Sequence, residues 1–242
     1  MMNIKRKPIQ LVVFDMAGTT IDEDNVVYKT LQKSVENQGI PCTLEEALSI
    51  GGGKEKQQAI IDIMIALGVD PAEAAILSKR AFAWFKAKLT ESYQKLEVRP
   101  CPGAAEVFSR LHKHGIQVVL NTGYNRETAQ SLLDKLGWEI GKEYDLLVTA
   151  SDVSASRPAP DMIQFAMRQL QVQDASKVLK IGDSAIDIEE GKHAGCGITL
   201  GITSGAQKYE QINQAKPDGI IDHLTGLIDW IEIPKSNNHD TR

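Results

Sequence analysis

Four short segments of the chain carry residue types that could together act on a phosphorus centre. A carboxylate can serve as nucleophile or metal ligand, whereas a hydroxyl group and a cation can hold phosphate oxygens. Further carboxylates can complete a magnesium site, so the set contains the parts that phosphoryl transfer needs. In chain order these residues are Asp15, Thr122, Arg157, Asp183 and Asp187.

Each of these segments also has a purely structural explanation when taken alone. Asp15 with Gly18 could form a turn, Thr122 and Asp183 could cap helices, and Arg157 could lie on the surface. All four occur in order at the ends of predicted strands. Their joint presence therefore favours one catalytic site over four unrelated turns.

The elements that must position these residues are those of an α/β fold. Short apolar runs rich in β-branched residues predict strands buried on both faces, and helical patterns alternate with them in the second half of the chain. We therefore predict a doubly wound, mostly parallel, Rossmann-like sheet, in which ligands bind beyond the carboxyl ends of the strands. The predicted strands are 9–14, 116–120, 146–149, 178–181 and 197–200, and the helices are about 103–114, 125–136, 160–170 and 185–194.

Residues 23–98 interrupt this alternation, because they show only helical periodicity, at about 24–38, 44–49, 55–67 and 72–96. We predict an inserted all-helical domain over 23–98 and an α/β core domain formed by 1–22 and 99–242. Apolar residues cover about half of the circumference of helix 72–96. Burial inside a helical bundle and a homodimer interface through these helices both explain that arc.

Composition excludes several classes of protein. The 242 residues are 42% hydrophobic and 24% charged, with a net charge of -5, which is typical of a folded globular enzyme. No apolar run approaches the ~20 residues of a membrane-spanning helix, and the mild acidity argues against binding nucleic acid or membrane. Three scattered cysteines favour a reduced, cytoplasmic location. The expected partner is a small phosphorylated or phosphonate metabolite.

The four segments resemble the motifs of the haloacid dehalogenase-like hydrolase superfamily, in the order found there. This resemblance implies that Asp15 is a nucleophile that forms an aspartyl-phosphate, and that Thr122 and Arg157 hold the phosphate group. The helical insert matches the small cap domain that closes over the active site in that family.

The same resemblance implies a Mg²⁺ cofactor. Its protein ligands would be the carboxylates of Asp15 and Asp183 and the carbonyl oxygen of Ala17, with Asp187 as a further ligand or a supporting carboxylate. An oxygen-only site beside phosphate suits magnesium.

Ala17 stands where ordinary phosphatases of the superfamily carry a second aspartate, which protonates the leaving group. Residues 15–20 (DMAGTT), residues 122–124 (TGY) and Arg157 are instead similar to the phosphonoacetaldehyde hydrolase, or phosphonatase, and phosphonatase-like subgroup. The resemblance implies that Thr19, Gly51, Gly123 and Tyr124 contact substrate.

Phosphonatases also place a Schiff-base lysine shortly after a glycine in the cap. Lys54 follows residues 50–53 (IGGG) in this way, although a solvated lysine at a helix start has the same sequence. Phosphonatases carry a histidine three residues beyond that lysine, where this chain has Gln57. An imine on Lys54 could accept the electrons of a breaking carbon–phosphorus bond, so that no acid at position 17 is needed.

Three functions are consistent with these residues. The first is magnesium-dependent cleavage of phosphonoacetaldehyde or a similar phosphonate through a Lys54 Schiff base. The second is a phosphatase acting on a small phosphate monoester. The third, a non-catalytic phosphometabolite-binding protein, is the least supported, because the nucleophile, phosphate-binding and metal-binding residue types all remain.

Restoring the missing acid tests the role of position 17. We expect Ala17→Asp to raise hydrolysis of phosphate monoesters relative to cleavage of phosphonates, since a well-placed general acid contributes ~10²–10⁴-fold. Steady-state kinetics on both substrate classes measure the ratio. No gain with any monoester would mean that the cap, and not position 17, determines the chemistry.

Overall fold

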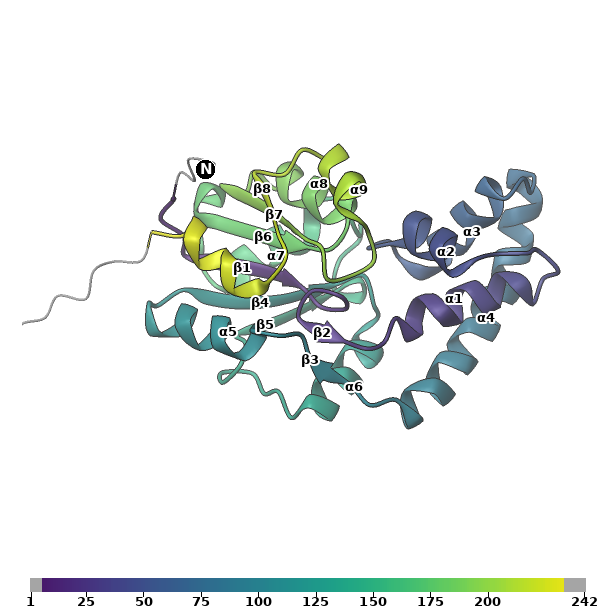
Figure 1. Ribbon diagram of the computed structural model, residues 1–242, viewed down its shortest axis with the longest axis horizontal. Coiled ribbons are helices and arrows are strands. Elements are labelled where there is room, and N and C mark those ends of the chain that lie inside the picture. The colour runs from purple at the N-terminus through teal and green to yellow at the C-terminus, as the bar shows by residue number, and fades with distance from the viewer. Residues whose placement is uncertain (1–5, 233–242) are drawn as a thin grey trace, which may run out of the picture.

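A six-stranded parallel sheet forms the centre of the computed structural model, which describes residues 6–232 (Figure 1). All neighbouring strands of this sheet pair in parallel. The predicted α/β class is thereby confirmed. The strand order is β5 (Leu146–Thr149), β4 (Gln117–Thr122), β1 (Leu11–Asp15), β6 (Val178–Gly182), β7 (Ile198–Ile202) and β8 (Gly219–Ile221).

Helices cover both faces of the sheet, and alternate residues of β1 enter two different cores. Val12 and Phe14 belong to the larger core, which includes the apolar face of α5. Leu11 and Val13 belong to a smaller core beneath α7. This two-sided burial explains why the strands appear in the sequence as nearly continuous apolar runs. The helices of the core are α5 (Ala104–Lys113), α6 (Arg126–Leu136), α7 (Asp161–Gln169), α8 (Ala185–His193) and α9 (Tyr209–Gln214), with 3₁₀ turns η1 (Ala150–Asp152), η2 (Ala175–Lys177) and η3 (Leu224–Trp230).

Four further helices form a group beside the sheet, on the right in Figure 1. They lie between β2 (Ile21–Asp22) and β3 (Arg99–Pro100), which pair antiparallel and so bring the two connections to this group side by side. The helices are α1 (Val26–Glu36), α2 (Leu44–Gly51), α3 (Lys56–Ala66) and α4 (Pro71–Lys95). They fall within the insert predicted over 23–98. The predicted core range includes residues 1–5 and 233–242, which lie outside the described residues.

Local capping chemistry determines where the insert helices begin. Thr43 and Glu46 form a reciprocal capping box before α2. The Asp70 carboxylate accepts two backbone N–H groups at the start of α4, and Pro71 occupies the first turn. These signals are readable in the sequence, and the predicted boundaries agree with the observed ones to within about two residues.

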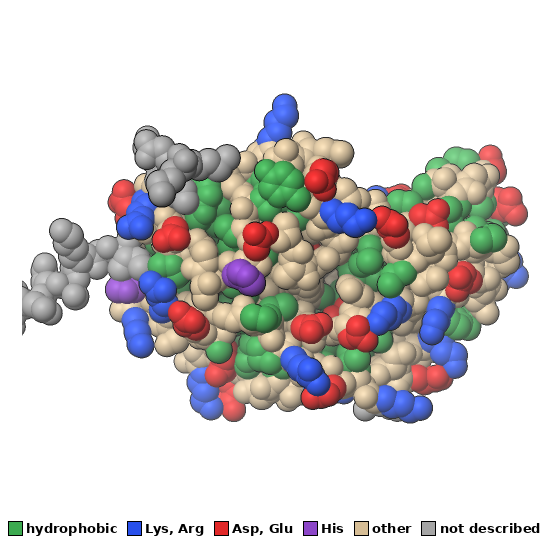
Figure 2. All heavy atoms as spheres, in the orientation of Figure 1, with side chains coloured by type: hydrophobic (Ala, Val, Ile, Leu, Met, Phe, Trp, Pro, Cys, Tyr) green, Lys and Arg blue, Asp and Glu red, His purple; other side chains and the backbone are tan. Residues whose placement is uncertain are grey.

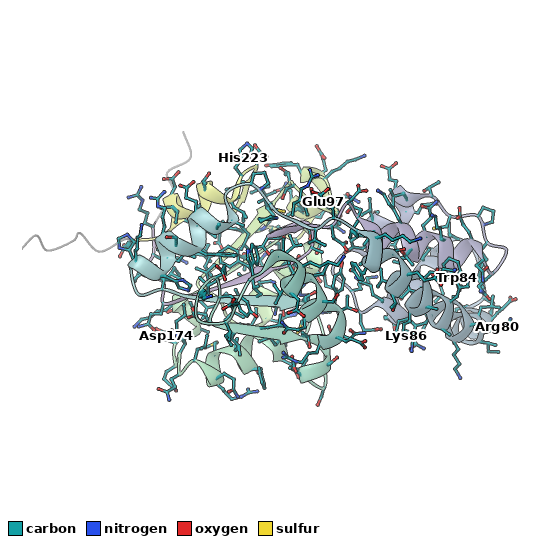
Figure 3. All side chains as sticks on the ribbon, turned by 90° about the horizontal axis from the view of Figure 1, so that it is seen from below. Arg80, Trp84, Lys86, Glu97, Asp174 and His223 are labelled. Carbon is teal, nitrogen blue, oxygen red and sulfur yellow. The ribbon has the colours of Figure 1, made fainter. Side chains whose placement is uncertain are left out.

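The wide apolar arc of α4 divides between two environments. Ala81, Phe85, Leu89 and Tyr93 are buried at four-residue spacing, while Ile76 is 66% exposed. Figure 3 shows Arg80, Trp84 and Lys86 along this helix, in the part of the molecule away from the sheet. The homodimer through the cap helices stays a prediction.

Two features concern the predicted absence of nucleic-acid and membrane binding, namely the distribution of surface charge and the apolar character of the helices. Figure 2 shows acidic and basic side chains interspersed over the face in view. Among residues 6–232, no helix combines the length and the apolar character that crossing a membrane requires.

An aromatic cluster supports the strand that ends in Asp15. Phe108 of α5 packs edge-on against Phe14 and Trp138, with ring centroids 5.1 and 5.3 Å away. We expect Phe108→Ala to lower the free energy of unfolding by about 3–5 kcal/mol, because it removes a buried aromatic ring. Urea denaturation measures the loss. The exposed Ile76→Ala is the control, and an equal loss in both variants would contradict this account.

Candidate active site

Three of the predicted site residues meet because β1 lies between β4 and β6. Asp15 ends β1, Thr122 ends β4, and Asp183 directly follows β6. All three side chains are buried, with residue exposures of 5%, 2% and 2%. Parallel strands end at one edge of the sheet, so the topology brings the nucleophile, hydroxyl and second carboxylate of the prediction together.

A tight turn after Asp15 closes this edge. The backbone N–H groups of Thr20 and Ile21 both donate to the Met16 carbonyl, and the Thr20 hydroxyl donates to the Asp15 carbonyl. Gly18 has φ +84°, and a Cβ there would lie 2.3 Å from Oδ2 of Asp183. Glycine is therefore required both for the turn and for the close approach of Asp183.

Arg157, in the segment before α7, lies at the centre of a buried ion network. Its Nη1 is 2.7 Å from Asp15 Oδ1 and 2.9 Å from Asp187 Oδ1, and its Nε is 3.0 Å from Glu190 Oε2. Lys180 Nζ contacts the same Asp187 and Glu190 oxygens at 3.0 and 3.2 Å. The structure thus brings Arg157 to Asp15, the predicted nucleophile. Lys180 and Glu190 were not among the predicted site residues.

The carboxylates of the site differ in their tendency to ionise. Burial, and then the charge of Asp187, raises the pKa of Asp15, while Arg157 opposes the rise. Burial and the charges of Asp15 and Asp187 raise the pKa of Asp183 well above its usual value. Although burial acts in the same direction on Asp187, Arg157 and Lys180 overcome it and lower the pKa of that group. Negative charge is thus least compensated at Asp15 and Asp183.

This pair of carboxylates fits a hard divalent cation. Asp15 and Asp183 repel each other, and a cation between them would relieve that repulsion. Gly205 leaves room beside Asp183, since a Cβ there would lie 1.9 Å from Oδ2. Within residues 6–232, no three His, Cys, Asp or Glu side chains are grouped as a metal site. Carbonyl and water oxygens would have to complete the shell, as magnesium commonly allows.

The two remaining predicted ligands, Asp187 and Ala17, differ in their surroundings from Asp15 and Asp183. Asp187 directs its carboxylate to Arg157, Lys180 and the Ser184 hydroxyl, with Ser184 Oγ 2.5 Å from Oδ2. These contacts are those of a supporting carboxylate for Arg157, and a role for Asp187 as a further metal ligand stays a prediction. Ala17 is 8% exposed and pairs through its backbone with Ile21 in the turn after Asp15.

The predicted substrate-binding residues lie on both sides of the junction between sheet and insert. Thr19 Oγ1 is buried and has no hydrogen-bond partner among the described residues, so it is available to a ligand oxygen. The Thr122 hydroxyl accepts the backbone N–H of Tyr124 at 3.2 Å. A Cβ on Gly123 would lie 3.0 Å from the Gly53 carbonyl oxygen, so this glycine allows the insert to touch the end of β4. Gly51 is buried in the insert, and a Cβ there would meet Leu31.

Lys54 reaches the core through its backbone. Its carbonyl oxygen would lie 3.3 Å from a Cβ on Gly123, but its Nζ pairs with Asp62 Oδ2 at 2.5 Å and its side chain is 29% exposed. The structure therefore brings the Lys54 backbone to the end of β4 and directs the amine along α3. A role for Lys54 as the Schiff-base residue stays a prediction.

A second lysine of the insert, Lys56, carries a buried amine. The sequence analysis did not identify it as a site residue. Lys56 is 6% exposed, and its Nζ lies 5.0 Å from the ring centre of Tyr28 and 5.3 Å from that of Tyr124. Its Nζ also donates to the Lys54 carbonyl at 2.7 Å. Burial lowers the pKa of Lys56 to about 8. The only sequence signal was a second lysine two residues on, at the start of the same helix.

A cavity of about 510 Å³ lies between the insert and the core. Lys56, Tyr93 and apolar residues of α4 form one wall, and Gly123 and Tyr124 with the start of α6 form the other. The cavity therefore connects the buried lysine with the end of β4.

Comparison with known proteins agrees with this geometry. Residues 9–195 match the haloacid dehalogenase-like hydrolase family. Phosphonoacetaldehyde hydrolase from Bacillus cereus is 32% identical over 219 residues, which cover 84% of this chain and 80% of that protein. The enzyme of the same name from Latilactobacillus sakei is 29% identical, over 94% of this chain and 87% of its own length.

Solved structures show the same fold. A phosphonoacetaldehyde hydrolase-like protein from Oleispira antarctica is 25% identical, with a TM-score of 0.77 and 93% of each chain covered. A hydrolase from Pseudomonas syringae, at 19% identity, has a TM-score of 0.78 over 93% of this chain and 100% of its own, and supports the fold alone. This chain belongs to the haloacid dehalogenase-like hydrolases, and it is an enzyme related over most of its length to phosphonoacetaldehyde hydrolases.

Proposed function

We propose that this hydrolase cleaves the carbon–phosphorus bond of phosphonoacetaldehyde or a similar β-carbonyl phosphonate, with Mg²⁺ as its cofactor. The observation that carries the proposal is the buried amine of Lys56, at the cavity between insert and core, in a site with alanine at position 17. The similarity to phosphonoacetaldehyde hydrolases supports it.

The amine must be unprotonated to condense with an aldehyde. An ordinary lysine has a pKa of ~10.4, so little of it is free base near neutral pH. Burial lowers the pKa of Lys56 to about 8, which makes free amine available under mild conditions. The resemblance to phosphonatases points to Lys54, but its amine is paired with Asp62. We therefore assign the imine to Lys56.

The proposed reaction has two linked parts. Lys56 condenses with the aldehyde and releases water, and an Asp15 oxygen then attacks phosphorus. The carbon–phosphorus bond breaks, and its electron pair moves into the iminium group to give an enamine. Protonation of the enamine carbon and hydrolysis of the imine release acetaldehyde, while water hydrolyses the aspartyl-phosphate. The overall reaction consumes one water molecule and gives acetaldehyde and phosphate.

Other residues bind and orient the reactants. Arg157 would hold the attacking carboxylate through its contact with Asp15 Oδ1, and the Thr19 and Thr122 hydroxyl groups would bind phosphonate oxygens. Bound by Asp15, Asp183 and the Ala17 carbonyl, Mg²⁺ would neutralise negative charge on the phosphonate. No acid is required at position 17, because the leaving group departs as a neutral enamine.

The size of the cavity favours a second candidate, a phosphatase for a phosphate monoester. A volume of about 510 Å³ exceeds what a two-carbon aldehyde fills and would admit a larger leaving group. Water or the substrate itself would then supply the proton that Ala17 cannot. Lys56 would bind the leaving group as a cation and would form no covalent bond.

Trapping the imine separates these two functions. We expect phosphonoacetaldehyde with borohydride to leave a reduced adduct on Lys56, identified by fragmentation of the peptide that contains it. Lys56→Arg should lose both the adduct and phosphonate cleavage, because a guanidinium group is not a nucleophile. Lys54→Arg, two residues away, is the matched control and should retain both.

The pH dependence gives an independent check. Below pH 8 the amine is mostly protonated, so the rate of cleavage should fall about tenfold per pH unit and level off above pH 8. An adduct on Lys54 would restore the assignment made from the resemblance. Monoester turnover without any adduct would favour the phosphatase.

The metal site predicts a loss of magnesium binding in Asp183→Asn. Changes that only support metal ligands cost about 10–100-fold in affinity, so loss of a direct ligand should cost at least as much. Calorimetric titration with MgCl₂ measures this. Asp174→Asn is the control, since Asp174 lies at the end of the molecule opposite the insert (Figure 3). Unchanged affinity in Asp183→Asn would contradict the assignment.

A further inference from the structure

Glu23 places a buried carboxylate where the core and the insert meet. It directly follows β2, at the entrance to the insert, and is 2% exposed. Tyr93, near the end of α4, donates its hydroxyl to Oε2 at 2.9 Å. Tyr124, which follows β4 in the core, donates to Oε1 at 3.2 Å. One carboxylate therefore connects three segments that are far apart in the sequence.

Tyr124 links this carboxylate to the amine of Lys56. The Tyr124 ring lies 5.3 Å from Lys56 Nζ, while its hydroxyl is bound to Glu23. The other ring beside this amine is that of Tyr28, whose hydroxyl accepts a hydrogen bond from the Gly53 N–H at 3.2 Å. Both aromatic faces beside the lysine are thus fixed through their hydroxyl groups, and Glu23 holds one of them.

The charged and polar groups that act on the Lys56 amine and the Glu23 carboxylate can be named. The Lys56 amine interacts with the charges of Asp15, Arg157, Glu23 and Glu55. Glu23 interacts with Lys56, and the Val27 backbone N–H and the two tyrosine hydroxyl groups face it. Burial raises the pKa of Glu23 to about 7. Its neighbours Asp22 and Asp24 are exposed.

Stability does not explain a carboxylate at this position. Burying an ionisable group is unfavourable even with hydrogen-bond partners, and a well-packed apolar residue is often equally stable. A buried acid beside an active-site cavity, in contact with a residue that lines it, is therefore a candidate for a functional role.

We propose that Glu23 is a positioning residue of the active site, which fixes the Tyr124 ring beside the Lys56 amine and provides negative charge that favours protonation of that amine. It acts through Tyr124 and Lys56 and does not touch substrate. The assignment of a reaction to Lys56 rests on the proposed function, whereas the link between Glu23 and Lys56 does not.

Labelling of Lys56 tests this link without relying on turnover. The probe is pyridoxal 5′-phosphate, an aldehyde that carries a phosphate group, fixed with borohydride and mapped by peptide mass spectrometry. In Glu23→Gln, which keeps the shape and loses the charge, we expect the pH midpoint for labelling Lys56 to fall by about 0.5–1 unit. Asp24→Asn is the matched control, because Asp24 is exposed and its φ of +52° suits asparagine. It should leave the midpoint unchanged.

Hydroxyl deletions test the positioning. Tyr124→Phe keeps the ring and removes its bond to Glu23, so labelling of Lys56 should decrease. Should Glu23→Gln not fold, as judged by thermal melting, Tyr124→Phe alone decides, and unchanged labelling in it overturns the proposal.

The remaining outcomes separate this proposal from the proposed function. An unchanged midpoint in Glu23→Gln overturns the role of Glu23 even if the enzyme cleaves phosphonates. Wild-type enzyme whose Lys56 is labelled with the expected shift, but which does not cleave phosphonoacetaldehyde, overturns the proposed function alone. Absence of labelling on Lys56 in the wild type overturns the role of Glu23.

Discussion

The buried ion network around Arg157 is the interaction on which the rest of the site depends. Arg157 contacts Asp15, Asp187 and Glu190, and its side chain is 1% exposed. Taking these charges from water is strongly unfavourable unless they remain paired in good geometry. The chain meets this constraint with residues from β1, β6, α8 and the segment before α7, so the sheet must be assembled before the Asp15 carboxylate is held in this orientation. Orientation of Asp15 is thus a property of the whole core.

The sequence predicted the parts of this arrangement that local patterns record. Strands buried on both faces appear as apolar runs, and Asp15, Thr122 and Asp183 follow such runs directly. The sequence analysis missed β8, because its three residues are only partly buried and are too few to show a periodic pattern of apolar residues. Lys180 lies inside a predicted apolar strand, and only the tertiary structure shows that it pairs with acids on α8. A single charged residue in a strand gives no such signal.

The cap lysine shows a different limit of sequence reasoning. Lys54 and Lys56 are two residues apart, and the pattern of glycines before them fits the first. Which amine is buried depends on the direction in which α3 begins. The Glu55 carboxylate accepts the N–H groups of Gln57 and Gln58 and so fixes that direction, with Lys56 as the first helical residue. A cap of this kind involves only neighbouring residues, but the aromatic rings that receive Lys56 come from α1 and from the segment after β4.

The two halves of the site solve the same electrostatic problem in opposite ways. In the core, Arg157 and Lys180 lower the pKa of Asp187, and Arg157 opposes the rise that burial causes in the pKa of Asp15. At the insert, burial acts against the charge of Lys56, and the proposed imine requires that this amine lose its proton. Burial raises the pKa of Asp15 and lowers that of Lys56, so in the proposed mechanism desolvation works against the carboxylate and in favour of the amine. In the proposed mechanism, the insert would therefore contribute to the chemistry through Lys56 as well as line the cavity between insert and core.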